Sequence, residues 1–170
     1  HEHYGVVPDL VTLGKPMGNG HPISGVVGRA DLIQEFGGKV MYFNTFGGNP
    51  VSCAAANAVL DVIESEKLQE NARVTGDYVI AGLERLARQH PIIGEVRGRG
   101  MFFAVELVRD RATRDPAGAA AKRVINAMRD RGVLISRIGP HDNILKIRPP
   151  LCFGREHARD GGLHVVDRVV

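Results

Sequence analysis

The chain has 170 residues, of which 44% are hydrophobic and 24% are charged, and its formal net charge is +3. This length suffices for a domain with a buried core, and the composition is in the range of soluble globular proteins. The Lys and Arg residues form no dense run, so the mild positive charge gives no indication of a nucleic-acid partner.

The cysteines and the apolar runs limit the expected cellular setting. Cys53 and Cys152 have neither metal-site spacing nor the pattern of a disulfide framework, which favours a reducing cytoplasm. No apolar run is long enough to cross a bilayer and no signal peptide is recognisable, so we expect no membrane partner. The chain lacks an initiator methionine, and we expect it to be part of a longer protein.

Short elements separated by turn residues are predicted for the first fifty residues. They are, in chain order, a buried strand at 9–14, a second strand at 22–29, a short helix at 30–38 that ends at Gly37 and Gly38, and an extended segment at 39–48.

Two longer helices are predicted next. Asn49 is a good N-cap and Pro50 suits the first helical position. The helix at 50–66 is small and apolar on nearly every side, so we expect it to be buried. A second helix at 67–90 ends before Pro91. Its expected apolar stripe consists of Leu68, Ala72, Thr75, Val79, Leu83 and Leu86.

The remaining residues alternate between strands and helices. The expected elements are one or two strands in 92–108 broken by Gly98 and Gly100, a helix at 117–132, strands at 133–138 and 143–151 joined by a turn, and a weaker helix at 154–170. This mixture predicts an α/β or α+β architecture. We expect three parts: residues 1–66, a connecting helix at 67–91, and a small domain at 92–170.

Lys15 stands at the end of the first predicted strand, in the segment VTLGKPMGNGHP. Pro16 predicts an extended conformation for Lys15, and the glycines after it allow a tight turn close to a ligand. A desolvated lysine attacks carbonyls as a neutral amine, which a Schiff base with an aldehyde such as pyridoxal phosphate requires. The alternative is a lysine whose tip reaches water from the end of a strand.

A second group of polar residues lies in YFNTFGGNP, residues 42–50. Thr45 offers a hydroxyl, Gly47 and Gly48 can expose backbone amides, and a helix begins directly afterwards. These features together suit a phosphate group. A plain Gly-Gly turn before a helix would have the same sequence.

A third segment, ILKIRPPL, places Lys146 and Arg148 on one face of a predicted strand. Their charges could bind a carboxylate or a phosphate of a substrate. The alternative is an exposed strand face with ordinary charges.

With these three segments, the sequence resembles the C-terminal part of the class III, fold-type I pyridoxal phosphate aminotransferases. PDLVTLGKPMGNGHPISGVV matches the cofactor-lysine segment, and NTFGGNP matches the segment that contacts the cofactor phosphate. GEVRGRGMFFAVEL and LKIRPPL match the start and the end of the small domain. The resemblance implies an α/β fold made of the end of the large cofactor-binding domain and a small α+β C-terminal domain.

The resemblance also implies an activity and roles for single residues. Lys15 would carry pyridoxal 5'-phosphate as a Schiff base and would then move a proton between the substrate Cα and the cofactor. Thr45, with Phe46 and Gly47, would contact the cofactor phosphate of the neighbouring subunit of a homodimer. Lys146 and Arg148 would bind substrate. The reaction would transfer an amino group from an amine or amino acid to an oxo acid in a ping-pong cycle.

Two departures from the family pattern qualify this prediction. The N-terminal half of the family is missing from this sequence, so we predict that the chain alone is inactive. Many members carry an arginine where Lys146 stands. Arginine binds a carboxylate with a two-pronged fork, whereas lysine is a point charge.

GKPMGNGHP together with YFNTFGGNPVSC resembles one branch of the family most closely. This branch holds phospho-lyases that act on phosphoethanolamine or phosphohydroxylysine, and Lys146 suits a substrate without a carboxylate. The sequence therefore leaves open an aminotransferase, which we favour slightly, a phospho-lyase, and a non-catalytic dimerisation fragment. No metal site is expected.

Overall fold

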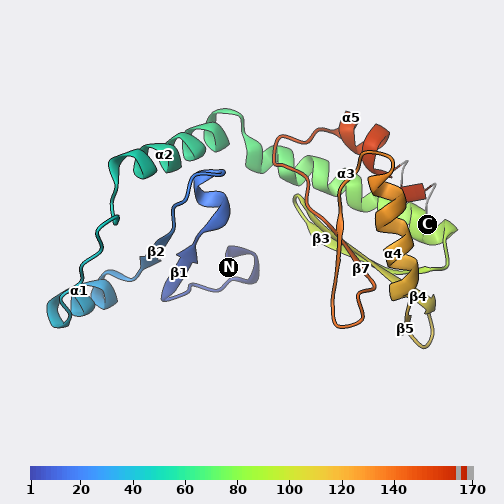
Figure 1. Ribbon diagram of the computed structural model, residues 1–170, viewed down its shortest axis with the longest axis horizontal. Coiled ribbons are helices and arrows are strands. Elements are labelled where there is room, and N and C mark those ends of the chain that lie inside the picture. Colours follow the sequence, from blue (N-terminus) through green and yellow to red (C-terminus); the bar gives the residue numbers. More distant parts are fainter. Residues whose placement is uncertain (164–165, 168–170) are drawn as a thin grey trace. The chain divides into compact units, whose positions relative to one another are not determined.

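The computed structural model describes residues 1–163 and 166–167. The chain forms two compact units, His1–Glu66 and Lys67–Val170, which we call unit 1 and unit 2 (Figure 1). Both units combine helices with strands, as the α/β prediction requires.

Unit 1 contains a strand pair and two helices that are longer than one turn. Its elements are η1 (Glu2–Tyr4), β1 (Leu10–Leu13), η2 (Lys15–Gly18), β2 (Gly25–Gly28), α1 (Ala30–Lys39) and α2 (Pro50–Ser65). β1 and β2 pair antiparallel, with Val11 opposite Val27. The predicted stop of α1 at its glycines is wrong, because the helix tolerates them and ends only where Val40 becomes extended.

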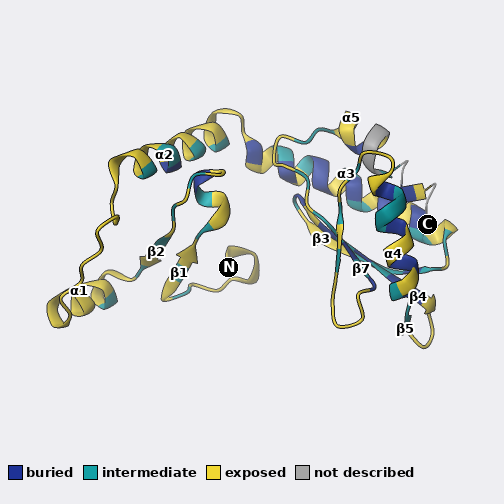
Figure 2. Ribbon diagram, viewed as in Figure 1, coloured by how far each residue is buried: buried dark blue, intermediate teal, exposed yellow. Residues whose placement is uncertain are grey.

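Most of unit 1 is exposed (Figure 2). Among its described residues, only Gly18 and Ala56 are buried. The expectation that the first strand and the helix at 50–66 are buried is therefore wrong for this chain. A helix that is apolar on nearly all sides needs neighbours on several sides, and in unit 1 the main contact of α2 is with the short η2.

Unit 2 is built on an antiparallel sheet. Its elements are α3 (Leu68–Gln89), β3 (Ile93–Arg99), β4 (Phe102–Asp110), β5 (Asp115–Pro116), α4 (Gly118–Arg129), β6 (Ser136–Ile138), β7 (Ile144–Ile147), α5 (Arg155–His157) and the π-helical η3 (Ala158–Leu163). The strand order is β3-β4-β7-β6, and β5 pairs with β4.

One face of this sheet packs against helices, and the other does not belong to the core. The predicted stripe of α3 is confirmed, since all six residues are buried. Ala72, Val79, Leu83 and Leu86 of this stripe join residues of β4, β7 and the inner side of α4, among them Phe103, Val105 and Leu145, in one cluster. Side chains alternate along a strand, so Phe102 and its same-face neighbours point to the opposite side, which we call the open face.

In unit 2, the predicted turn at Gly100 is confirmed, but the predicted break at Gly98 is not. The segment 92–108 forms two strands, one of the two predicted outcomes, and the chain turns at Gly100, whose φ is 53°. Gly98 lies inside β3 and does not break it. The predicted closing helix is described only in part, as α5 and η3; His164, Val165 and residues 168–170 lie outside the described residues.

Candidate functional site

Lys15 begins η2 in an unusual backbone conformation. Its φ is 34°, in the left-handed region that residues other than glycine rarely adopt. The predicted extended conformation is therefore wrong. The amide of Met17 donates to the carbonyl of Gly14, and the amide of Asn19 donates to that of Pro16, both at 3.0 Å. These two turns fix the backbone on either side of Lys15.

The amine of Lys15 is available to a ligand. The residue is exposed in unit 1, and its Nζ forms no hydrogen bond or ion pair with any described residue. The sequence argument assumed a desolvated lysine at the end of a buried strand. Within residues 1–66 nothing covers it, because β1 is itself exposed.

In the turn at 44–48, two backbone amides are already hydrogen-bonded to a side chain of the same turn. Oδ1 of Asn44 accepts hydrogen bonds from the amides of Phe46 and Gly47, each at 3.1 Å. The prediction that Gly47 exposes a free amide is therefore wrong in this structure. Within the described residues, the hydroxyl of Thr45 and the amide of Gly48 have no hydrogen-bond partner. These two donors are free for an anion.

The start of α2 is capped as predicted. Oδ1 of Asn49 accepts from the amides of Val51 and Ser52, at 3.0 and 3.2 Å. Because these amides are already satisfied, α2 contributes mainly the positive end of its dipole to this region.

Lys146 lies on the open face of the sheet in unit 2. It is half-buried in β7, opposite Ala104 of β4 and Ser136 of β6. Arg148 follows the end of β7, and its guanidinium carbon is 5.9 Å from the centroid of the Phe102 ring. Phe102 belongs to the same open face, so both predicted cations lie at this side of the sheet.

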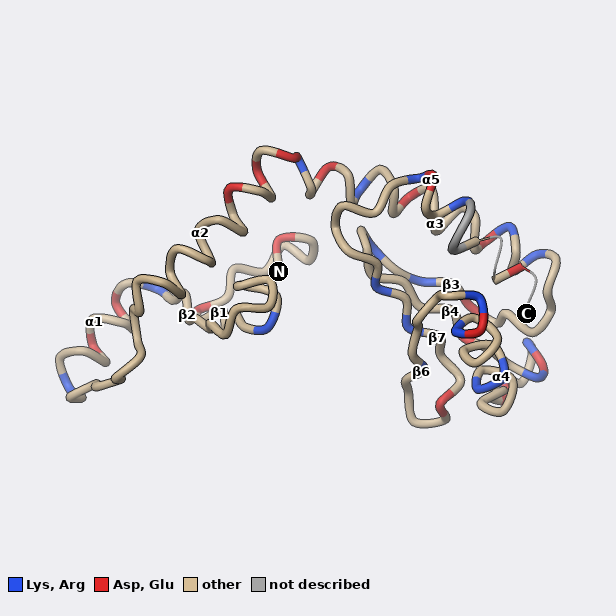
Figure 3. Tube along the Cα trace, turned by 45° about the horizontal axis from the view of Figure 1, so that its top comes forward, with Lys and Arg blue, Asp and Glu red and all other residues tan. Residues whose placement is uncertain are grey.

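Other charges near Lys146 neutralise one another. Glu95 accepts hydrogen bonds from Arg114 at 2.8 Å and from Arg97 at 2.7 Å, and both arginines also reach Glu106. The hydrogen bond from Arg114 is the main reason why the pKa of Glu95 is lowered. Lys146 has no carboxylate partner in the part of the chain that is described. Figure 3 shows the Lys and Arg residues that gather along β3 and its neighbours.

One cavity of unit 2 has an almost wholly apolar lining. This cavity of about 360 Å³ is lined by apolar residues such as Leu83, Phe103 and Met128, and Arg148 is the only titratable residue of its lining. Residues 1–163 and 166–167 contain no group of three or more His, Cys, Asp or Glu side chains arranged for a metal. No helix among them is both long and apolar enough to cross a bilayer.

Two polar contacts were not predicted from the sequence. Nε2 of His21 lies 2.8 Å from Oγ of Ser52. Nδ2 of Asn71 donates to the carbonyls of Leu151 and Phe153, at 2.6 and 3.1 Å. The partners are 31 residues or more apart, so neither periodicity nor motif spacing signals these contacts.

The comparisons with known proteins cover nearly the whole chain. The family model described as aminotransferase class-III matches residues 1–169. An alanine–glyoxylate aminotransferase 2-like protein of Drosophila melanogaster is 51% identical over 92% of this chain and 32% of its own length. An ethanolamine-phosphate phospho-lyase homolog of Caenorhabditis elegans is 47% identical over 90% of this chain and 33% of its own.

The similar solved structures are likewise phospholyases and transaminases. A phospholyase from Arthrobacter in complex with phosphoethanolamine has a TM-score of 0.95 and 52% identity, over 99% of this chain and 40% of its own. An amine transaminase from an uncultivated Pseudomonas species, in the PLP-bound form, has a TM-score of 0.83 and 34% identity, over 99% and 39%. The chain thus spans about a third of the length of the curated relatives it matches.

Proposed function

Since the chain belongs to the class-III aminotransferase family, we propose that it forms part of a pyridoxal 5'-phosphate-dependent enzyme in which Lys15 holds the cofactor. The observation that carries this proposal is the lysine itself. Its backbone is held in a strained turn and its amine is unpaired among the described residues. A PLP-bound transaminase among the structural neighbours supports the same cofactor.

The donors of unit 1 fit two parts of this cofactor. The free amine of Lys15 suits the aldehyde, because a neutral amine attacks carbonyl carbon. The hydroxyl of Thr45 and the amide of Gly48 suit the phosphate, and the positive end of α2 adds a favourable field. Phe46 and Gly47 belong to the same turn and shape it through Asn44. In the proposed homodimer, Thr45 serves the neighbouring subunit's cofactor.

The chemistry of the reaction divides between cofactor and chain. The bound cofactor stabilises the negative charge that develops at the substrate Cα. Nζ of Lys15 would hold the cofactor, and the same atom, once free, would take the proton from the substrate Cα. Lys146 and Arg148 orient the substrate by pairing with its anionic group. In amino-group transfer, an oxo acid then receives the amino group.

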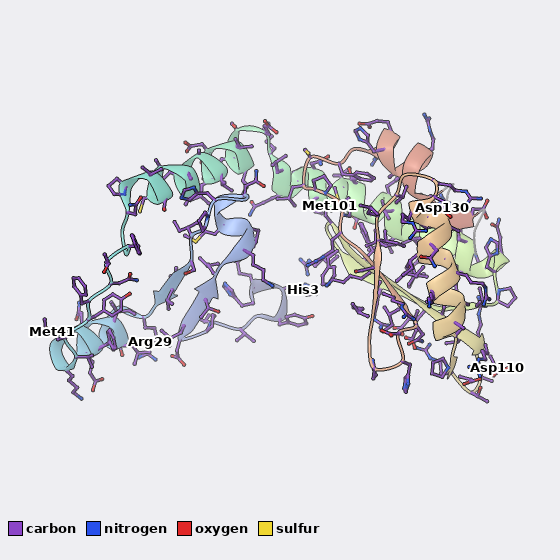
Figure 4. The ribbon with its side chains drawn as sticks, in the orientation of Figure 1. His3, Arg29, Met41, Met101, Asp110 and Asp130 are labelled. Carbon is purple, nitrogen blue, oxygen red and sulfur yellow. The ribbon has the colours of Figure 1, made fainter. Side chains whose placement is uncertain are left out.

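The exposed apolar residues of unit 1 support the proposed dimer. Around the turn of Thr45, large apolar side chains face solvent: Met41 is 96% exposed (Figure 4), and Phe43 and Phe46 are each 80% exposed. Exposed apolar side chains of this kind, close together in the sequence, are typical of surfaces that further protein covers. A subunit interface would cover these residues and bring Thr45 to the partner's cofactor.

Phosphate elimination is a second candidate, and Lys146 favours it. A point charge without a carboxylate partner suits the phosphate of a phosphorylated amine at least as well as a carboxylate. The relatives include a phospholyase in complex with phosphoethanolamine. In this reaction the substrate loses a proton from Cα and a phosphate from the adjacent carbon.

Trapping the cofactor on Lys15 tests the first proposal. We expect borohydride reduction of the full-length, cofactor-loaded protein to leave a stable adduct on Lys15, found by mass spectrometry of peptides. Lys15→Ala should abolish the adduct, and Lys39→Ala, which removes another lysine of unit 1, should leave it unchanged. An adduct that persists on another lysine in Lys15→Ala would contradict the proposal.

Phosphate release separates the two reactions. With phosphoethanolamine, a phospho-lyase releases inorganic phosphate in catalytic amounts, and Lys146→Ala should raise KM about tenfold or more, as expected for the loss of a charged contact. Lys122→Ala, on the exposed side of α4, is the control. No phosphate, combined with amino-group transfer from alanine, would identify an aminotransferase.

A further inference from the structure

One side-chain hydrogen bond ties the lysine turn of unit 1 to helix α2. Nε2 of His21 and Oγ of Ser52 are 2.8 Å apart, both residues are partly buried, and 31 positions separate them. Among the described residues, this is the only side-chain hydrogen bond formed by any residue of the segment 14–24.

Close packing supports this hydrogen bond. Ser52 and Ala56 are four residues apart, so they share one face of α2, and Ala56 is buried. Gly18 at the end of η2 is buried as well, and a Cβ there would lie 2.7 Å from Cγ2 of Ile23. η2 and α2 are in contact, and the glycine keeps the lysine turn itself compact where it meets the helix.

His21 also belongs to the lysine turn through its backbone. Its amide donates to the carbonyl of Gly18 at 3.0 Å, and Gly18 is the last residue of the 3-10 turn that begins at Lys15. Lys15 itself has a φ of 34°, which persists only where the surrounding structure holds it. A side chain that fixes one end of this turn on α2 therefore restricts the place of the Lys15 amine.

We propose that His21 is a positioning residue for Lys15: its hydrogen bond to Ser52 fixes the lysine turn on the first turn of α2, and so sets where the amine meets the cofactor. The proposal rests on the assignment of Lys15 as the cofactor lysine. The bond is available in every protonation state of His21, because Ser52 Oγ can either donate to Nε2 or accept from it.

The test uses the full-length, cofactor-loaded protein and four variants: His21→Leu, Ser52→Ala, the double variant and His21→Gln. The first measurement is the affinity for pyridoxal 5'-phosphate, followed by its absorbance. We expect His21→Leu and Ser52→Ala each to weaken binding about two- to tenfold, the range of one partly buried hydrogen bond. The double variant should be no worse than either single variant, because both remove the same bond.

Two further readouts separate positioning from general stability. The midpoint of the pH titration of the cofactor's visible absorbance reports on the environment of Lys15 Nζ, and we expect it to shift in His21→Leu and Ser52→Ala. His21→Gln places an amide near the position of Nε2 and should recover most of the wild-type midpoint. His141→Leu, which removes an exposed histidine of unit 2, should leave the midpoint and the affinity unchanged.

The outcomes distinguish this inference from the proposed function. An unchanged affinity and midpoint in His21→Leu and Ser52→Ala, while Lys15→Ala abolishes the adduct, would overturn the role of His21 alone. Wild-type protein that forms no adduct on Lys15 would overturn the proposed function first. Additive losses of cofactor affinity in the double variant would mean that the two side chains do not act through one shared hydrogen bond. A melting temperature lowered equally with and without cofactor in every variant would mean that the bond serves only the stability of the fold.

Discussion

At the scale of single residues, Lys15 combines a strained backbone with an unpaired side chain. A residue other than glycine in the left-handed region costs about 1–3 kcal/mol, and the proline that follows restricts it further. The hydrogen bonds of Met17 and Asn19 hold the turn in place. The backbone of unit 1 therefore holds the Cα of Lys15 in a defined conformation before a ligand binds.

Replacing Lys15 by two small residues tests this strain. Both Lys15→Ala and Lys15→Gly remove the amine, but only glycine adopts a φ of 34° without penalty. We expect cofactor-free Lys15→Gly to be about 1 kcal/mol more stable than cofactor-free Lys15→Ala, measured by thermal unfolding of the full-length protein. Equal melting temperatures would mean that the turn is unstrained.

The carboxylate of Glu95 gives a pH dependence of stability. Hydrogen bonding to Arg114, with the nearby charge of Arg97, lowers the pKa of Glu95 in the folded state. The stabilisation is therefore complete above the ordinary glutamate pKa of about 4.3 and is lost as the pH falls through the lowered folded value. Glu95 is 43% exposed, so water and salt screen the effect.

Melting temperatures between about pH 3 and 6 test this dependence around the ordinary pKa. We expect the advantage of the wild type over Glu95→Gln to be greatest near pH 6 and to shrink towards zero at the acidic end. High salt should reduce it at every pH. An advantage that grows as the pH falls would contradict the sign of the pKa shift.

At the scale of elements, the contact of α3 with the β3–β4 turn depends on a glycine. A Cβ on Gly76 would lie 2.3 Å from the carbonyl oxygen of Gly100, a backbone atom that has little freedom to move. Gly37 in α1 has no heavy atom within 4 Å of the same position. These two helical glycines form a matched pair for one substitution.

We expect Gly76→Ala to destabilise the protein by about 1–3 kcal/mol through overpacking. Gly37→Ala should be neutral or should stabilise α1 by up to about 1 kcal/mol, because alanine is the better helix former. Thermal unfolding of both variants decides the matter. Similar destabilisation by both would mean that the tight approach of α3 to Gly100 is not what Gly76 provides.

The elements also show what the sequence could predict. The stripe from Leu68 to Leu86 has helical period, so the buried side of α3 was predictable from spacing alone. The conformation of Lys15 was not predictable in this way. A residue before proline is normally extended, but the two hydrogen-bonded turns around Lys15 impose a left-handed conformation instead. The pairing of His21 with Ser52 depends on how η2 meets α2, and local spacing does not encode it.

At the scale of the whole molecule, the hydrophobic core belongs to unit 2. The core cluster runs from Ala72 to Val166, whereas the described residues of unit 1 bury only Gly18 and Ala56. Burial of apolar surface is the main favourable term in folding. The resemblance to the cofactor-lysine segment thus identified residues in a unit that has little core of its own.

This asymmetry predicts which unit folds alone. We expect residues 67–170, expressed by themselves, to retain helical circular dichroism and to unfold cooperatively, because their sheet packs against α3 and α4 without any residue of unit 1. Residues 1–66 should unfold without a cooperative transition. Leu83→Ala in the isolated unit 2 should cost about 2–5 kcal/mol, since Leu83 is 1% exposed. A cooperative transition in residues 1–66, or a disordered unit 2, would mean that stability is distributed differently from burial.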